Sequence, residues 1–114
     1  MGKNERVLPE ASFHVLVALA RGERHGYGII QDVERATDGA MRMGAGTLYR
    51  TLQRLLEQGH IAETRERPAP ADDDERRRYY RITEEGRAAA RAEAKRLAEM
   101  VRLAEARGIV KEAL

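Results

Sequence analysis

The sequence contains no cysteine among its 114 residues, which excludes disulfides, thiolate-bound zinc and a cysteine nucleophile. It has no tryptophan and one phenylalanine, so a pocket built on aromatic stacking has few residues to draw on. Ser12 is the only serine, and it lies in an apolar stretch rather than in a nucleophile motif. The three histidines, His14, His25 and His60, are too scattered to form a metal site. We therefore expect no enzymatic activity, no metal and no cofactor.

Long apolar runs are missing as well. None approaches the roughly 20 residues that a membrane-spanning helix needs, and residues 1–6 are polar, unlike the start of a signal peptide. We expect a cytoplasmic protein without membrane contact. Its 21 basic and 19 acidic residues nearly balance, with a formal net charge of +2. Any binding to nucleic acid must therefore come from local clusters of positive charge.

The segment 46–59 has the pattern of an amphipathic helix with two contrasting faces. Its leucines recur at helical spacing and form one apolar stripe: Leu48, Leu52, Leu55 and Leu56. The other side carries hydrogen-bond donors and no acid: Thr47, Arg50, Thr51, Arg54 and Gln58. Such groups are suited to phosphate oxygens and base edges. With Gly44 as a candidate N-cap and Gly59 as a stop signal, the segment is predicted to be a DNA recognition helix.

The remainder of the first 83 residues fits a winged helix-turn-helix. The sequence predicts helices over residues 9–20 and 25–37, a very short strand over 41–43, and longer strands over 61–67 and 76–82. A polar loop that contains two prolines separates the last two strands, which form the wing. The first helix is expected to bury a wide apolar stripe: Phe13, Val15, Leu16, Val17, Leu19 and Ala20.

A long helix is predicted over residues 84–107, with Thr83 as its N-cap. Small and apolar residues recur along it as in a coiled coil: Ala90, Ala94, Leu97, Val101 and Ala104. Charged residues are expected to cover the outside: Glu93, Lys95, Arg96, Glu99 and Arg102. A small head cannot bury the seam of a protruding helix, so we expect a partner helix from a second copy; the alternative is packing on the chain's own head. The predicted dimer interface consists of Ala94, Leu97, Met100, Val101 and Ala104.

The predicted fold class is therefore mainly α with a small β-hairpin. Residues 1–83 are predicted to form a winged helix-turn-helix DNA-binding domain, and residues 84–114 a C-terminal dimerisation helix. The first helix is expected to pack against the last helix of the partner copy.

Three segments together resemble the PadR family of bacterial transcriptional regulators. They are the run Gly46-Thr47-Leu48-Tyr49 with Leu52, Leu55 and Gly59; the run His25-Gly26-Tyr27-Gly28-Ile29; and the run from Tyr79 to Gly86. They occur in the order typical of the family, and the resemblance spans roughly residues 8–103. The single C-terminal helix resembles the short form of these regulators. One position departs from the family pattern, because Arg50 stands where a proline is usual, which should leave the helix intact.

Tyrosines and the arginines of the wing complete the predicted DNA-binding set. Tyr27 opens the second helix, where backbone N–H groups favour a phosphate, and in PadR-like proteins this tyrosine lies near the DNA backbone. Tyr49 either offers its hydroxyl to a phosphate or is a plain core residue. One of Tyr79 and Tyr80 should face the core, and the sequence leaves open which one. Three arginines of the second wing strand either reach the DNA or neutralise the acids of the wing: Arg76, Arg77 and Arg78.

These patterns predict a homodimeric repressor whose two recognition helices enter successive major grooves about 34–36 Å apart. Its operator would then be an inverted repeat. The family resemblance implies release by a small hydrophobic or aromatic effector at or near the dimer interface. Candidate pocket residues are Phe13, Val17, Met100 and Leu103. Two alternatives are a winged-helix protein-interaction module that does not bind DNA, and an enzyme or small-molecule carrier, which the absence of a catalytic cluster disfavours.

Overall fold

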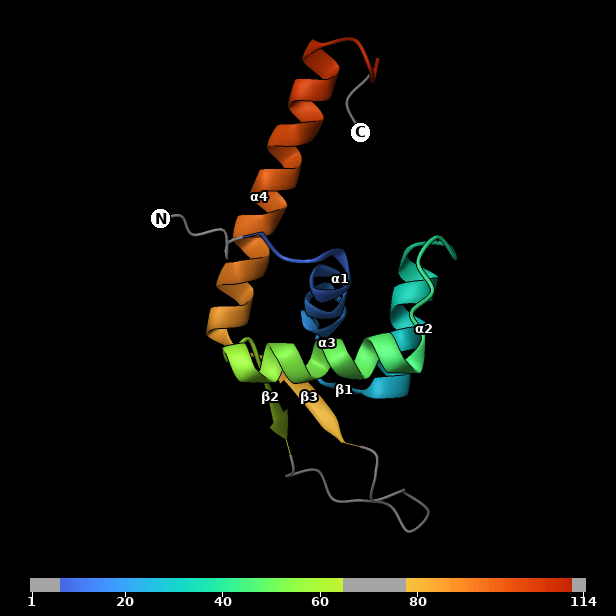
Figure 1. Cartoon of the computed structure of the whole chain (residues 1–114), viewed down its shortest axis with the longest axis vertical. Coiled ribbons are helices and arrows are strands. Elements are labelled where there is room, and N and C mark those ends of the chain that lie inside the picture. The colour runs from blue at the N-terminus through green and yellow to red at the C-terminus, as the bar shows by residue number, and fades with distance from the viewer. Residues whose placement is uncertain (1–6, 65–77, 112–114) are drawn as a thin grey trace.

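The computed structural model describes residues 7–64 and 78–111 as a winged head from which one helix projects (Figure 1). In chain order the elements are α1 (Glu10–Leu19), β1 (Arg24–His25), α2 (Gly26–Ala36), α3 (Ala45–Gln58), β2 (Ile61–Thr64), β3 (Tyr79–Ile82) and α4 (Glu84–Ala106). The molecule extends over 56 × 36 × 23 Å, because the C-terminal half of α4 rises away from the head. Within the described ranges, no helix has the length and apolarity needed to cross a membrane. The predicted mainly helical winged fold is confirmed.

The helix boundaries lie at capping residues that can be recognised in the sequence. Gly44 is the N-cap of α3, and Gly59 ends that helix with a positive φ of 80°, a conformation that glycine adopts at little cost. Thr83 caps α4 by accepting a hydrogen bond from the Gly86 N–H at 3.0 Å. His25 caps α2 in the same way, since its Nδ1 accepts from the Gly28 N–H at 3.1 Å.

The core forms where α1 packs on α2, α3 and α4. Its largest fully buried side chains come mainly from α1, α2 and α3: Leu16, Leu19, Ile29, Leu48, Leu52, Leu55 and Val15. The stripe predicted for the first helix is partly wrong, because Val17 and Ala20 are exposed whereas Ser12 and Ala18 are buried. Neighbours on several sides of α1 set a buried arc that is rotated from the one the apolar residues suggested.

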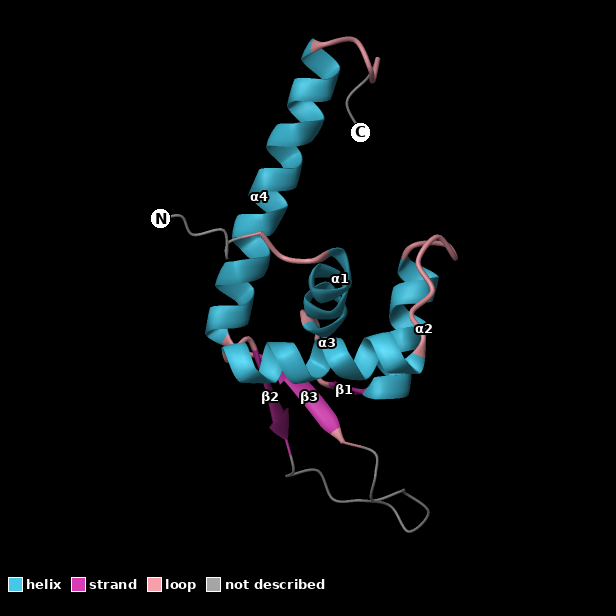
Figure 2. Cartoon of the chain, in the orientation of Figure 1, coloured by secondary structure: helices cyan, strands magenta, loops and turns pink. Residues whose placement is uncertain are grey.

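Three antiparallel strands form the sheet, in the order β1-β3-β2 (Figure 2). The predicted hairpin is present as β2 and β3, with Ile61 paired to Ile82, and residues 65–77 lie outside the described part. The short strand predicted at residues 41–43 is wrong: that segment is irregular, and Met43 is buried in the core. Tyr80 is the wing tyrosine that faces the core, while Tyr79 is half-buried.

The first turns of α4 are joined to the head at a contact that we call the α3–α4 joint, formed by Gly59, His60, Thr83 and Gly86. The Thr83 hydroxyl donates to the Gly59 carbonyl oxygen at 2.7 Å, and the Thr83 N–H donates to the His60 carbonyl oxygen at 3.0 Å. Gly86 lies so close to His60 that a Cβ there would overlap the His60 carbonyl oxygen. The end of α3 and the start of α4 are thereby fixed to each other.

Glu93 forms a second attachment of α4 and corrects the prediction that it faces outward. It is 3% exposed, and its carboxylate accepts from the Leu8 N–H at 3.3 Å and from the Arg96 Nε at 3.1 Å. The Arg96 hydrogen bonds lower the pKa of Glu93 despite the opposing effect of burial. Glu93 therefore ties the N-terminal segment to α4.

Candidate nucleic-acid interface

One face of α3 is open to solvent along its whole length. It lines a shallow groove and consists of six residues, which we call the outer stripe: Gly46, Tyr49, Arg50, Gln53, Arg54 and Glu57. The opposite face of the helix holds the buried side chains of Leu48, Leu52 and Leu55. The predicted division of this helix into an apolar and a polar face is confirmed.

The membership of the polar face differs from the prediction in several places. Thr47 and Gln58 are exposed but do not line the outer stripe. Thr51 is 8% exposed, so its assignment to the solvent face is wrong. Glu57 lies on the outer stripe, so this face is not free of acids as predicted. Gln53 was missed, although its spacing of three residues from Arg50 and four from Tyr49 is the signal that identifies it.

The positive charge of the outer stripe comes from Arg50 and Arg54, which are both exposed. Arg50 Nη2 lies 3.5 Å from the Thr47 hydroxyl, so the two predicted contact residues share one side of the helix. Gln53 Nε2 donates to Glu57 Oε2 at 3.1 Å. Guanidinium and amide groups on one exposed helical face can bind both phosphates and base edges.

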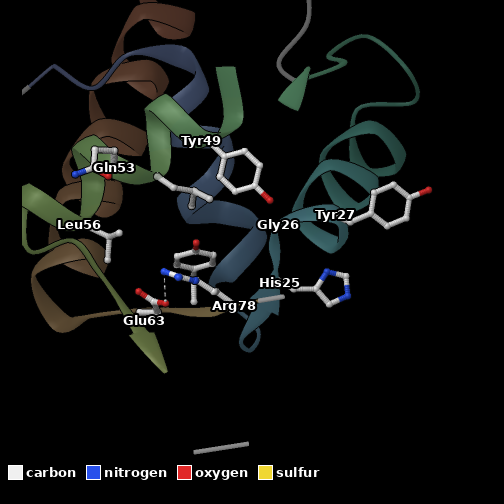
Figure 3. A pocket seen from close by; sticks show the side chains of 10 residues that line it. His25, Gly26, Tyr27, Tyr49, Gln53, Leu56, Glu63 and Arg78 are labelled. Carbon is white, nitrogen blue, oxygen red and sulfur yellow. Dashed lines mark hydrogen bonds and ion pairs between the residues drawn. The ribbon is translucent and has the colours of Figure 1, made fainter. Parts of the chain in front are cut away.

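A cavity of about 640 Å³ lies between α3, the start of α2 and the wing (Figure 3). Tyr49, 54% exposed, points its hydroxyl toward Gly26, whereas Tyr27, 61% exposed, points away from it. Gly26 makes this approach possible, because a Cβ there would lie 2.7 Å from the Tyr49 hydroxyl. Tyr49 is therefore not a plain core residue, and both tyrosines have hydroxyls within reach of a ligand on the head.

On the wing side of the cavity, Arg78 Nη1 pairs with Glu63 Oε2 at 3.2 Å (Figure 3). Burial, followed by the negative charge of Glu63, raises the pKa of the nearby Tyr80 hydroxyl above its ordinary value of 10.0. Tyr80 therefore stays neutral. Arg78 is 56% exposed at its side chain, so it can exchange Glu63 for another anion. The other two predicted wing arginines, Arg76 and Arg77, lie outside the described residues.

The residues predicted for the dimer interface lie on the part of α4 beyond the head. Ala94 is exposed, Val101 and Ala104 are half-buried, and Leu97 and Met100 are 37% and 53% exposed. Leu103 is likewise 53% exposed. Exposed apolar side chains along a projecting helix form a surface that another apolar surface can cover.

The four residues predicted for an effector pocket do not line one cavity of a single chain; whether a dimer brings them together stays a prediction. Phe13 lines a cavity of about 440 Å³ between α1 and α4, together with Leu97 and Arg96. Val17, Met100 and Leu103 do not line this cavity. Across residues 7–64 and 78–111, no group of three or more histidine, aspartate or glutamate side chains could hold a metal ion.

Comparison with known proteins identifies relatives of this chain. A transcriptional regulator from Clostridium thermocellum has a TM-score of 0.69 and 26% identity, over 81% of this chain and 86% of that one. A PadR family transcription regulator from Clostridium difficile R20291 has a TM-score of 0.71 and 18% identity, over 85% and 96%. Bacillus subtilis PadR in complex with operator DNA has a TM-score of 0.59 and 20% identity, over 70% of this chain and 44% of that one. No curated protein is similar enough in sequence to count as a match.

A family model supplies the assignment. The model described as the transcriptional regulator PadR-like family matches residues 15–92, which is more than half of the chain. That range includes all three sequence motifs from which the resemblance was predicted. It also covers the winged head from the middle of α1 to the first part of α4. The chain therefore belongs to the PadR-like family of transcriptional regulators, which are not enzymes.

Proposed function

We propose that this chain is a homodimeric repressor that binds an inverted-repeat operator through α3 and the wing. The observation that carries the proposal is the outer stripe, which presents Arg50, Gln53 and Arg54 to solvent directly opposite the leucines of the core. Tyr27, Tyr49 and Arg78 extend this surface toward α2 and the wing. Such a regulator acts in the cytoplasm, where the DNA lies.

The roles of these side chains follow from their chemistry. Arg54, Thr47 and the tyrosine hydroxyls donate hydrogen bonds to phosphates and hold the head on the duplex. Arg50 and Gln53, nearer the centre of the exposed face, meet base edges in the major groove. Arg76, Arg77 and Arg78 supply positive charge from the wing. A structural relative was solved with operator DNA, which supports this use of the fold.

Dimerisation is proposed through the projecting part of α4. Leu97, Met100 and Val101 lie on this part, beyond the point where Glu93 holds the helix to the head. Ala94 and Ala104 continue the seam at coiled-coil spacing and allow a partner helix to approach closely. Two copies related by a two-fold axis would present two recognition helices to an inverted repeat.

Release by a small hydrophobic or aromatic effector is part of the proposal. The cavity beside Phe13 lies between α1 and α4, next to Leu97 of the seam. A ligand there acts only if it binds more tightly to a dimer geometry that misfits the DNA.

The test is binding of the purified chain to duplex DNA from upstream of its own coding region, followed by fluorescence anisotropy over a salt series. We expect two chains per site, a steep fall of affinity with salt and clear preference over a scrambled duplex. A variant that carries both Arg50→Ala and Arg54→Ala should lose this binding, whereas Lys95→Ala, an exposed change on α4, should not. Absence of binding to either duplex at low salt would favour a protein-interaction module.

A further inference from the structure

Gln53 lies in the part of α3 that points farthest from the core. At about 100° per residue, four members of the outer stripe fall within an arc of about 60° opposite the core leucines: Gly46, Arg50, Gln53 and Glu57. Tyr49 lies at one edge of the exposed face and Arg54 at the other. Edges of a helix in a major groove face phosphates, whereas its central line faces base pairs. Gln53 therefore has the position of a base-reading residue.

Glu57 sets the orientation of the Gln53 amide. Gln53 Nε2 donates to Glu57 Oε2 at 3.1 Å, one helical turn away. Only the amide nitrogen can face an ionised carboxylate, because the carboxylate accepts hydrogen bonds and cannot donate them. The contact therefore determines which way round the amide lies and uses one of its two N–H groups. Its carbonyl oxygen and its second N–H remain for another partner.

One acceptor beside one donor is the pattern that adenine complements in the major groove. The adenine amino group donates to the glutamine oxygen, and adenine N7 accepts from the glutamine nitrogen. Guanine presents two acceptors at the same edge and cannot satisfy the glutamine oxygen. On the basis of the proposed DNA-binding function, we infer that Gln53 reads an adenine in each half-site and that Glu57 is the positioning residue for the Gln53 amide.

The first experiment selects binding sites from a pool of DNA duplexes with a randomised centre, using the full chain, Gln53→Ala and Gln58→Ala. Gln58 is the matched control, because it is an exposed glutamine about 140° around the same helix. The wild type and Gln58→Ala should enrich the same motif, with one A·T pair per half-site that Gln53→Ala no longer selects. An unchanged motif from Gln53→Ala, or loss of a preference for a different base pair, would overturn the inference.

The second experiment separates the hydrogen bond of Glu57 from its charge. Wild-type chain should prefer the selected duplex by at least about tenfold over one with that A·T pair changed to G·C. Glu57→Ala and Glu57→Gln both remove the negative charge, but only the glutamine can still accept from Gln53. The preference should fall in Glu57→Ala, in which the Gln53 amide can turn either way, and remain at least about twofold larger in Glu57→Gln, whose amide oxygen can still accept in the adenine-reading orientation although its nitrogen can also donate in the reverse one. Equal preferences in these two variants would refute the positioning role.

Failure of DNA binding and failure of adenine recognition would give different results. If the wild-type chain enriches no motif and binds no duplex in a salt-dependent manner, the proposed function fails and the inference fails with it. If the wild-type chain enriches a motif that Gln53→Ala leaves unchanged, only the reading of adenine fails. Far-UV circular dichroism of each variant checks that the helical fold is intact.

Discussion

Gly86 provides a test of the α3–α4 joint, because the structure predicts that an alanine there destabilises a helix that alanine ordinarily favours. Inside α4, replacing glycine by alanine would by itself stabilise the helix by up to about 1 kcal/mol. The new Cβ, however, would overlap the His60 carbonyl oxygen and lie 3.0 Å from the carbonyl carbon. Both atoms belong to the backbone, so the contact cannot be relieved by turning a side chain.

The size of the effect follows from what must move. Overpacking a tight contact costs about 1–3 kcal/mol. Separating α4 from α3 also weakens the two Thr83 hydrogen bonds to Gly59 and His60, at about 1 kcal/mol each. After subtraction of the helix-propensity gain, Gly86→Ala should lower the free energy of unfolding by about 2–4 kcal/mol. For a domain of this size, that corresponds to a fall of Tm by about 8–16 °C.

The assay is urea and thermal unfolding followed by circular dichroism at one fixed protein concentration, since a dimer gains stability by mass action. Gly46→Ala is the matched control, because its Cβ would meet only the flexible end of Arg50, at 3.6 Å. That variant should be as stable as the wild type or more stable by up to about 1 kcal/mol. A Gly86→Ala chain that unfolds at or above the wild-type midpoint would show that the contact between Gly86 and His60 does not restrain α4.

Three further predictions concern charge and assembly. The pKa of Glu93 is lowered, so the contribution of its ionised form to stability is present above the ordinary pKa of 4.5 and is lost as the pH falls through the folded-state pKa. The urea midpoints of wild type and Glu93→Gln should therefore differ at pH 7 and converge in acid. A difference that stays constant with pH would contradict this. Arg54→Ala should reduce the slope of log affinity against log salt by about one unit, measured by anisotropy, while Lys95→Ala leaves it unchanged. Met100→Glu should weaken dimerisation at least about tenfold in sedimentation experiments, because it buries a carboxylate in the proposed apolar interface; an unchanged dimer would argue for a different contact surface.

Much of this fold could be predicted because its signals are local. The leucine spacing of α3 and the residues that begin or end helices, such as Gly59 and Thr83, act within a few positions of the chain. The family motifs lie in the same segments. Such features can be recognised without knowing which elements pack against them, and the structure places them where the sequence indicated.

The missed features depend on partners far away in the sequence. β1 has two residues and exists through its pairing with Tyr79 and Tyr80 of β3. Glu93 is buried because it accepts from the N–H of Leu8, which is 85 positions away. Thr51 and Gln53 are two residues apart on α3. Which of them faces solvent depends on how wide an arc of the α3 surface the neighbouring elements bury. Periodicity alone does not give that width.

The α3–α4 joint has a consequence for how far apart the two heads of the proposed dimer stand. α4 has 23 residues and is therefore about 34 Å long. A change of about 5° in its angle at the joint displaces the far end by about 3 Å, close to the rise of one base pair. In such a dimer, the separation of half-sites that the protein accepts is set far from the DNA, by the stiffness of the two attachments of α4: the backbone contact between Gly86 and His60 and the hydrogen bond from Leu8 to Glu93. Substitutions at these attachments would then alter the preferred length of the operator without touching any residue that meets a base.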